Sequence, residues 1–374
     1  MTRFKAKKQY FCIMISSFPT QLEAWYEANG RDLPWRQTND PYLIMLSEFI
    51  LQQTQIVQGM SYYLRFAKRF PTAESLAKAS EEEVMRLWQG LGYYSRARHL
   101  HAAAKKIAEA GCFPKDYSFI RALPGVGDYT AAAIMSFAFE EPYAVLDGNV
   151  QRVLARHFGI TEPVDSTQGK KLLRALADEM LDHKHPAFYN QAIMDFGALQ
   201  CKPTSPLCEA CPLAETCQAL KEHLVDKLPI KAKRTSVRDR YFTYIYTRTE
   251  DGKVLLHRRG SGDIWQGLFE FPMIESACKL TSKQVDEFLQ CKGQYSLTLV
   301  ASDIRHQLTH QRLHADFYCL TLPSSETQLE GKWVEEKLLD HYALPRLLEK
   351  LLEKLKSSST TCVSCKKSFL QQEE

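Results

Sequence analysis

The sequence predicts a mainly α-helical N-terminal region followed by an α+β C-terminal domain. Between residue 18 and about residue 220, helix-capping signals recur and no alternating strand pattern is present. Residues 222–240 contain Pro229 and six basic side chains, a composition typical of a linker. From Tyr241 onward the pattern changes to strand-like alternation, with a turn signal at Asp251-Gly252 and a second strand over Lys253–Arg258. The chain therefore divides into two different architectures.

Length and charge agree with this division. A chain of 374 residues is long enough for two domains, each with its own core. The net charge of +4 is compatible with a nucleic-acid partner without being diagnostic of one. Candidate phosphate contacts are the basic stretches Arg96–Arg98, Arg152–Arg156 and Lys231–Arg240, although most surface lysines and arginines only solubilise a protein.

The N-terminus resembles a short signal peptide only superficially. Basic residues Lys5 to Lys8 precede an apolar run from Tyr10 to Ile15, but the run is brief and no small-residue cleavage site follows. We expect residues 1–15 to be an N-terminal extension, with Met14 as an alternative start. No segment of the sequence is long and apolar enough to predict a membrane span.

The segment that follows Asp40 predicts a helix with one carboxyl group on an apolar surface. Asp40, or the asparagine before it, can cap the helix, and Pro41 suits its first turn. Glu48 is the only charged side chain between Asp40 and Arg65, and apolar residues stand three and four positions away from it. Desolvation should then raise the pKa of Glu48. The alternative is an exposed glutamate on the polar side of the helix.

A glycine turn between two helices is predicted near the middle of this region. Leu123–Thr130 reads Leu-Pro-Gly-Val-Gly-Asp-Tyr-Thr, and an alanine-rich helix follows over Ala131–Met135. A short apolar-periodic segment, Tyr117–Leu123, can form the preceding helix. The result is a helix-hairpin-helix, whose free backbone N–H groups can bind a nucleic-acid backbone without reading sequence. A lone Gly-x-Gly turn, however, is often only a turn.

A second carboxyl group stands at a predicted helix start. The apolar run in Tyr143–Val150 ends at Asp147, and a helical pattern begins over Val150–Phe158. An aspartate at this point can be the helix N-cap, where the helix dipole favours its ionised form. An ordinary structural cap is the alternative.

Four cysteines lie close together with the spacing C-x6-C-x2-C-x5-C: Cys201, Cys208, Cys211 and Cys217. Four thiolates so near in sequence can bind one metal centre, either an iron–sulfur cluster or a four-cysteine zinc site. The spacing alone does not separate these two possibilities.

Together these segments resemble the adenine DNA glycosylases of the MutY type. The resemblance is dense over about residues 18 to 220 and thinner at Ile264–Pro272 and Arg305–His310. Several motifs in the same order are more specific than any one of them. The motifs are LSEFILQQTQ, GLGYYSRARHL, LPGVGDYTAAA, VLDGNVQRVLAR, FYNQAIMDFGALQC and the cysteine run.

The resemblance implies a fold and a domain plan. The N-terminal region would be a helix-hairpin-helix DNA glycosylase, with a six-helix module and an iron–sulfur cluster module, and the C-terminal domain would be Nudix-like. No REx2EE-type signature follows Phe271-Pro272, so pyrophosphatase activity is not expected. The expected boundaries are 1–15 for the extension, 16–221 for the helical region (six-helix module about 36–142, cluster module 16–35 and 143–221), 222–240 for the basic linker, 241–352 for the Nudix-like domain and 353–374 for a polar tail.

The family also implies the chemistry. Its cysteine run binds a [4Fe-4S] cluster, so Cys201, Cys208, Cys211 and Cys217 are expected to hold that cofactor. Glu48 would protonate N7 of adenine, and Asp147 would stabilise the cationic sugar. Tyr129 and Asn149 match family positions beside this pair.

One position separates two enzyme types. In the related endonuclease III type, a lysine after the hairpin forms a Schiff base and cuts the strand; here Tyr129 stands at that position. We therefore expect a monofunctional glycosylase. A DNA-binding cluster protein without catalysis is a third hypothesis, against which the intact Glu48 and Asp147 argue.

Further positions match family residues that contact DNA. Gln53 and Tyr93 match residues that wedge into the duplex, and the target base must leave the stack before its bond can be reached. In the family, a Phe-Ser-His loop reads 8-oxoguanine; here it aligns with Leu308, Thr309 and His310, so the aromatic ring is missing. The expected DNA-binding residues are Gln53, Thr54, Leu91, Tyr93, Gly125, Val126, Gly127 and Gln191.

The expected function is therefore removal of adenine mispaired with 8-oxoguanine or guanine, which begins base excision repair. The expected partner is double-stranded DNA containing such mispairs, and the expected protein is a monomer without a membrane association. We expect a bacterial cytoplasmic location, associated with the nucleoid.

Overall fold

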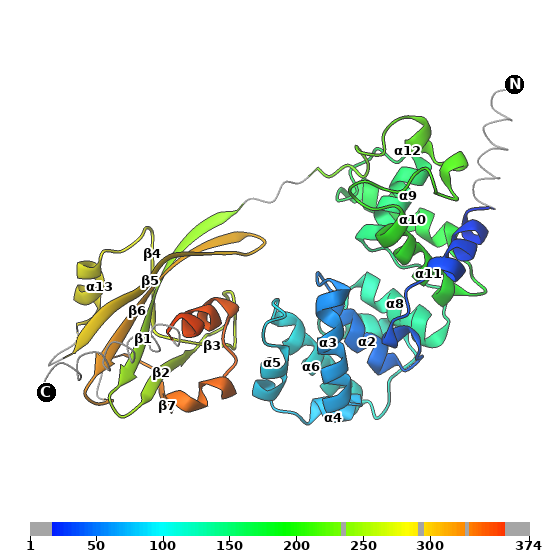
Figure 1. The fold of residues 1–374 in the computed structure, drawn as a ribbon. Coiled ribbons are helices and arrows are strands. Elements are labelled where there is room, and N and C mark those ends of the chain that lie inside the picture. Colours follow the sequence, from blue (N-terminus) through cyan, green and yellow to red (C-terminus); the bar gives the residue numbers. More distant parts are fainter. Residues whose placement is uncertain (1–16, 233–236, 291–294, 326–328, 356–374) are drawn as a thin grey trace, which may run out of the picture. The chain divides into compact units, whose positions relative to one another are not determined.

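The structure of this chain is a computed structural model that describes residues 17–232, 237–290, 295–325 and 329–355 (Figure 1). One compact unit takes the described residues up to Lys78 and those from His99 to residue 232. The other takes Ala79–Arg98 and the described residues from 237 onward. The extension expected at residues 1–15 and most of the expected tail lie outside the described residues. Within the described ranges, no helix combines the length and the apolar character that a membrane crossing needs.

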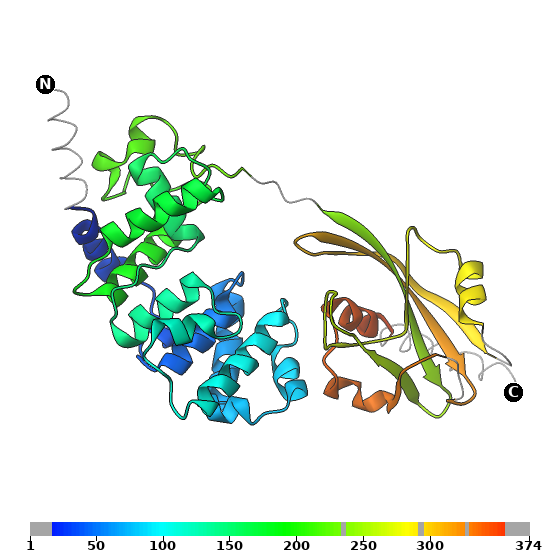
Figure 2. The same ribbon diagram turned by 180° about the vertical axis from the view of Figure 1, so that it is seen from behind.

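The N-terminal region is helical, as the sequence predicts, and no strand is found in its described part (Figure 2). Its elements are a helix over residues 17–29, η1 (Pro34–Arg36), α2 (Pro41–Leu51), α3 (Ile56–Arg69), α4 (Ala73–Ala77), α5 (Glu81–Trp88), α6 (Ser95–Glu109), α7 (Tyr117–Ala122), α8 (Asp128–Phe139), α9 (Gly148–Phe158), α10 (Thr167–Met180), α11 (Pro186–Asp195), the π-turn η2 (Phe196–Gln200), η3 (Ala214–Thr216) and α12 (Gln218–Lys221).

Two predicted helix caps are confirmed. The Asp40 carboxylate accepts a hydrogen bond from the backbone N–H of Tyr42 at 2.8 Å, and Pro41 is the first residue of α2. The Asp147 carboxylate accepts from the backbone N–H of Val150 at 2.8 Å and so caps α9. In both places the cap satisfies N–H groups that have no partner within the helix. The caps therefore fix where the helices that carry Glu48 and Asp147 begin.

The predicted helix-hairpin-helix is also present, formed by α7, a glycine turn and α8. Gly125 has a φ of +77°, in the left-handed region that favours glycine. A Cβ atom on Gly125 would lie 2.6 Å from Cβ of His99 and 2.9 Å from Cε1 of Phe49. Both the backbone angle and the lack of space therefore require glycine at this position.

The helices α9, α10 and α11 share a core with the N-terminal helix of residues 17–29. Phe18, Leu154, Leu173, Tyr189 and Phe196 are buried in it. These apolar residues recur at helical spacing, which is why segments far apart in sequence pack together. This core holds the start of α9, where Asp147 lies, against the helix that leads into the cysteine run.

The C-terminal domain carries a mixed β-sheet with the strand order β3-β2-β1-β6-β5. β1 and β6 run parallel, β5 pairs antiparallel with β6, β4 pairs with β1 and β7 pairs with β2. The elements are β1 (Arg238–Thr249), β2 (Lys253–Arg258), β3 (Phe269–Glu270), β4 (Met273–Ser276), α13 (Ser282–Leu289), β5 (Ser296–Gln307), β6 (Gln311–Leu322), β7 (Lys332–Glu335), η4 (Glu336–His341) and a helix over residues 346–355.

Some predicted boundaries shift. The predicted strand at Lys253–Arg258 is β2, and Gly252 has the positive φ that the predicted turn needs. β1, however, begins at Arg238, so the last residues assigned to the linker belong to a strand. Arg240 explains the difference, because it pairs with Asp263 and Glu275 and its strand is thereby held in the sheet. The final helix also continues through residue 355, into the segment expected to be tail.

We predict that Gly125→Ala destabilises the helical unit by about 1–3 kcal/mol, because it combines a strained φ with overpacking. Gly127→Ala is the matched control: Gly127 has an extended φ of −95° and no heavy atom within 4 Å of a built Cβ. It should cost less than about 1 kcal/mol. Urea denaturation of both variants measures the difference, and equal losses would show that the hairpin does not require glycine at 125.

Candidate active site

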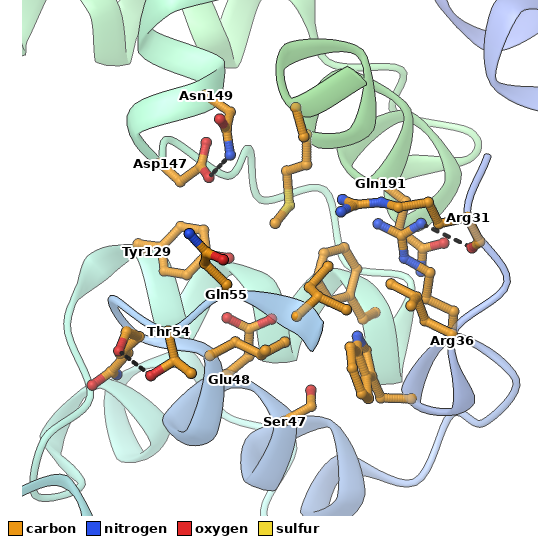
Figure 3. A pocket seen from close by; sticks show the side chains of 18 of the residues that line it. Arg31, Arg36, Ser47, Glu48, Thr54, Gln55, Tyr129, Asp147, Asn149 and Gln191 are labelled. Atoms are coloured by element: carbon orange, nitrogen blue, oxygen red, sulfur yellow. Dashed lines mark hydrogen bonds between the residues drawn. The ribbon is translucent and has the colours of Figure 1, made fainter. Parts of the chain in front are cut away.

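A pocket of about 800 Å³ lies in the first unit (Figure 3). Its walls come from the segment before α2, α2 itself, the loop after it, α8, the start of α9 and α11. Seven residues singled out from the sequence therefore meet in one cavity, although they come from distant parts of the chain: Glu48, Gln53, Thr54, Tyr129, Asp147, Asn149 and Gln191.

Glu48 is buried in this pocket, on the inner face of α2, with only 7% of its surface exposed. Burial raises its pKa to about 7, and the nearby negative charge of Asp147 acts in the same direction. A hydrogen bond with Tyr129 and the positive charge of Arg36 oppose that rise. The predicted desolvation of Glu48 is confirmed. A carboxyl group with this pKa can hold a proton near neutral pH and release it to a substrate.

Asp147 lies at the N-terminus of α9, in a different environment. Its carboxylate accepts hydrogen bonds from the backbone N–H of Val150 and, at 2.9 Å, from Nδ2 of Asn149. Burial raises its pKa above the usual aspartate value, while these hydrogen bonds and the charge of Arg152 act to lower it. The sequence suggested only the stabilising effect of the helix start. The structure adds an opposing desolvation that the sequence pattern does not reveal.

Arg152 connects the Asp147 cap to the cysteine run. Its Nη2 atom donates to Oδ1 of Asn149 at 2.9 Å and to the carbonyl of Gly197 at 2.6 Å, and its Nε donates to the carbonyl of Cys201 at 2.8 Å. Gly197 lies in the π-turn, and a Cβ there would meet Cβ of Asn149 at 2.7 Å. The position of Asn149 therefore depends on contacts with the segment that leads into the cysteines.

Several arginines predicted to be phosphate contacts are instead buried. Arg96 donates to the carbonyl of Gly92 at 3.1 Å, and Arg156 donates to the carbonyls of Leu228 and Lys202. Arg152 has the contacts given above. Arg240 is held in ion pairs with two carboxylates. These guanidinium groups, each less than 9% exposed, satisfy backbone and acidic groups of the protein itself, so the phosphate prediction was wrong for them.

An ionic cluster that no sequence pattern indicates lies beside the pocket, around Asp195. Asp195 is completely buried and accepts from Arg36 through two hydrogen bonds of 2.7 Å, and from the backbone N–H and Nε of Arg31 at 2.9 and 3.0 Å. A buried carboxylate with two guanidinium partners is stable as the charged form. The only signal in the sequence was an acid within the apolar segment of α11, which does not reveal its partners.

The loop after α2 places Gln53 and Thr54 at the pocket. Gln53 has a φ of +55°, a left-handed conformation that is uncommon for residues other than glycine. Tyr93, the second predicted wedge residue, has a φ of +47° and is 47% exposed. Strained backbone of this kind is frequent at functional sites. Leu91 differs: its side chain is 5% exposed and packs inside, which removes the basis for a DNA contact by that side chain.

The backbone N–H groups of the hairpin are not all available to a partner. The N–H of Val126 already donates to the carbonyl of Leu123 at 3.1 Å, so it is not available to a phosphate. Gly125 and Gly127 are exposed, and in the described residues no hydrogen bond is formed by their N–H groups. The expected contact with the DNA backbone is therefore limited to the N–H groups of these two glycines.

The four predicted cysteines line one small, mostly apolar cavity of about 30 Å³ together with Arg156. Nη1 of Arg156 lies 3.5 Å from Sγ of Cys201. In the described part of the chain, no group of three or more histidine, cysteine or acidic side chains is arranged to hold a single metal ion. The structure thus gathers the four thiols around one cavity beside a positive charge.

The predicted reading loop lies at the β5–β6 hairpin of the second unit. Leu308 donates its N–H to the carbonyl of Gln311 at 2.8 Å and packs partly against the domain core. Thr309 and His310 are exposed at the tip. The Thr309 hydroxyl already forms a hydrogen bond with the hydroxyl of Tyr93, so among the described residues of this tip only His310 has uncommitted side-chain polar atoms, and Leu308 is mainly structural.

Comparisons with known proteins identify the family. Residues 46–179 match the HhH-GPD superfamily of base excision DNA repair proteins, and residues 243–354 match the NUDIX domain. The adenine DNA glycosylase of Buchnera aphidicola subsp. Acyrthosiphon pisum (strain APS) is 32% identical over 345 residues, which cover 89% of this chain and 96% of that protein. The chain belongs to the adenine DNA glycosylase family.

Another relative agrees with this assignment, and a solved structure agrees with the helical fold. The adenine DNA glycosylase of Homo sapiens is 42% identical over 216 residues, covering 55% of this chain and 40% of that protein. A solved structure of a thermostable thymine-DNA glycosylase superposes with a TM-score of 0.53 at 29% identity, covering 57% of this chain and 99% of that one. The protein is thus a DNA glycosylase, a hydrolase that removes adenine from DNA in base excision repair, and the predicted fold class is confirmed.

For this glycosylase we predict that excision slows as the pH rises through about 7, because Glu48 then loses its proton. Above that pH the single-turnover rate should fall about tenfold per pH unit. Glu48→Gln should reduce the rate by at least about 100-fold at every pH, with DNA affinity nearly unchanged. Single-turnover assays between about pH 6 and about pH 9 test both points. A profile that stays flat above pH 7 would contradict the general-acid role.

Proposed function

We propose that this glycosylase releases adenine from A:8-oxoguanine or A:guanine mispairs in double-stranded DNA, by hydrolysis and without cutting the strand. The observation that carries the proposal is the pair of carboxyl groups in one pocket, Glu48 in an apolar setting and Asp147 at a hydrogen-bonded helix start. Two acids in unlike environments are the usual way in which one site supplies both a proton and an anion.

Cleavage of the glycosidic bond begins when protonation makes the base a better leaving group. Glu48, protonated near neutral pH, donates its proton to N7 of the adenine. The bond from C1′ to N9 then breaks, and its electron pair goes to the base. The sugar is left with oxocarbenium character, which the carboxylate of Asp147 stabilises electrostatically. The hydrogen bonds from Val150 and Asn149 hold that carboxylate in place.

Water completes the reaction. The carboxylate of Glu48, now without its proton, accepts a proton from the water that attacks C1′, so the products are free adenine and an abasic site. Cleavage of the strand would need an amine nucleophile able to form a Schiff base with the opened sugar. Tyr129 occupies the position after the hairpin, and its hydroxyl is engaged with Glu48. The reaction therefore stops at the abasic site.

Access to the pocket requires extrusion of the nucleotide, because the glycosidic bond cannot be reached in the stack. Gln53 and Tyr93, both held in left-handed conformations, are the residues proposed to enter the duplex. The exposed N–H groups of Gly125 and Gly127 would bind the phosphate backbone. Recognition of the opposite base is assigned to Thr309 and His310 at the tip of the β5–β6 hairpin.

The cysteine cavity fits a [4Fe-4S] cluster. Cys201, Cys208, Cys211 and Cys217 supply four thiolate ligands, and Arg156 supplies a positive charge 3.5 Å from one sulfur. When bound, such a cluster contributes structural cross-linking of this segment and takes no part in the proton transfers above. The carbonyls of Cys201 and Lys202 are already fixed by Arg152 and Arg156, which orients the loop for its ligands.

The proposed reaction predicts adenine release from duplexes with A opposite 8-oxoguanine or guanine, and little release from A opposite thymine. Strand breaks should form only after alkali treatment, because no enzyme amine attacks the sugar. The assay compares the three duplexes with and without alkali and adds borohydride to trap any Schiff base. Nicking without alkali, or efficient trapping, would refute the monofunctional assignment, and equal release from A:T would refute mispair specificity.

The proposed cluster predicts a yellow-brown protein with about four irons per chain and broad visible absorption. Cys208→Ser should lose iron and DNA affinity. Cys112→Ser is the matched control, because Cys112 is an exposed cysteine outside the cavity, and it should keep both. Metal analysis and visible spectra measure the effect. A colourless protein with one zinc per chain would establish the zinc alternative instead.

A further inference from the structure

A chain of hydrogen bonds leads from the buried ionic cluster to the pocket wall. Arg36 is held by Asp195 through two hydrogen bonds, and its Nη1 atom also donates to the hydroxyl oxygen of Tyr26 at 3.2 Å. The Tyr26 hydroxyl in turn lies 2.9 Å from Oε1 of Gln191 and donates to it. Gln191 lines the pocket, whereas Tyr26 lies behind the wall.

The donor groups fix the direction of each hydrogen bond in this series. A guanidinium group can only donate, so the Tyr26 oxygen must accept from Arg36. The hydroxyl proton is then directed toward Gln191, which must present its carbonyl oxygen to Tyr26. Burial raises the pKa of Tyr26, so the hydroxyl keeps this proton at neutral pH. The amide nitrogen of Gln191 is left without a partner among the described residues, and it is a donor only.

This end of the pocket therefore presents donors to a bound base. Arg31 also lines it, and its Nη1 atom has no hydrogen bond in the described residues because Nε and Nη2 are both on Asp195. In Figure 3, Asp147 and Asn149 lie on one side of the pocket, Gln191 and Arg31 lie on the opposite side, and Glu48 lies below both pairs. A base whose sugar lies beside Asp147 and whose N7 faces Glu48 directs the edge farthest from the sugar toward Gln191.

We propose that Tyr26 is a positioning residue for base selection: it locks the Gln191 amide with the nitrogen facing the pocket, where it donates a hydrogen bond to N1 of the extruded purine. This inference rests on the proposed function. Adenine has an unprotonated N1 that accepts such a bond. Guanine carries a hydrogen on N1, which would meet the donor of Gln191 and be repelled. The lock thus favours adenine over the undamaged guanines of the duplex.

The test compares adenine with 1-deazaadenine, which has C–H in place of N1, in duplexes opposite 8-oxoguanine. The wild-type enzyme should excise 1-deazaadenine more slowly, and Tyr26→Phe should shrink that difference by about three- to tenfold, the value of one hydrogen bond. A cycle of two enzymes and two bases cancels the unequal intrinsic stability of the two glycosidic bonds. 3-Deazaadenine is the base control, whose ratio to adenine should be the same in both enzymes.

Tyr189→Phe is the matched protein control. This substitution also removes a tyrosine hydroxyl, and Tyr189 lies on α11, the helix that carries Gln191. The Tyr189 hydroxyl is buried and has no hydrogen-bond partner in the described residues. Its adenine to 1-deazaadenine ratio should equal that of the wild type. Tyr26→Phe keeps the ring that packs edge-on against Phe188 at 5.0 Å, so it should fold, as thermal melting checks.

Three outcomes decide whether Tyr26 holds the Gln191 amide in this orientation. A ratio that falls in Tyr26→Phe and not in Tyr189→Phe supports the lock. An unchanged ratio in Tyr26→Phe overturns it, even if adenine release itself slows, because a merely structural role would slow both bases alike. If the wild type releases no adenine from any mispair, the proposed function fails first and the inference falls with it.

Discussion

The chemistry that we propose for this protein depends on the burial of one carboxyl group, that of Glu48. Glu48 can keep a proton near neutral pH because α2 holds its side chain buried, where desolvation raises its pKa to about 7. The surroundings keep that effect within limits. Tyr129 and Arg36 favour the charged form, and without them the same burial would raise the pKa of Glu48 further. The pocket therefore balances desolvation against two nearby polar groups.

Local sequence signals predicted the residues whose role depends on their own helix. Asp40 and Asp147 stand at helix starts, and Glu48 stands on an apolar face, so capping and periodicity were sufficient to predict their settings. The glycine turn at Gly125 likewise follows from short-range geometry. Because these features depend on neighbours within a few positions, a single sequence contains most of the information that determines them.

Residues that depend on distant partners were not predictable in this way. Asp195 pairs with Arg31 and Arg36, more than 150 positions away, and nothing in the local pattern of either segment indicates the other. The same limit explains the arginines taken for phosphate contacts. Charge is visible in a sequence, but burial of Arg152 or Arg156 against carbonyl groups results from packing between helices and the cysteine segment. Leu91 is a related case, since a family position does not show which way its side chain faces.

The left-handed backbone of Gln53 has a consequence for how this protein can evolve. A residue other than glycine pays roughly 1 kcal/mol or more to adopt that conformation. Selection for stability alone would therefore favour glycine there, since glycine adopts it without strain. Such a change would remove the side chain that borders the pocket. Selection for a more stable fold and selection for a side chain at the pocket thus act in opposite directions at position 53. The presence of glutamine indicates that the side chain was kept at the expense of stability.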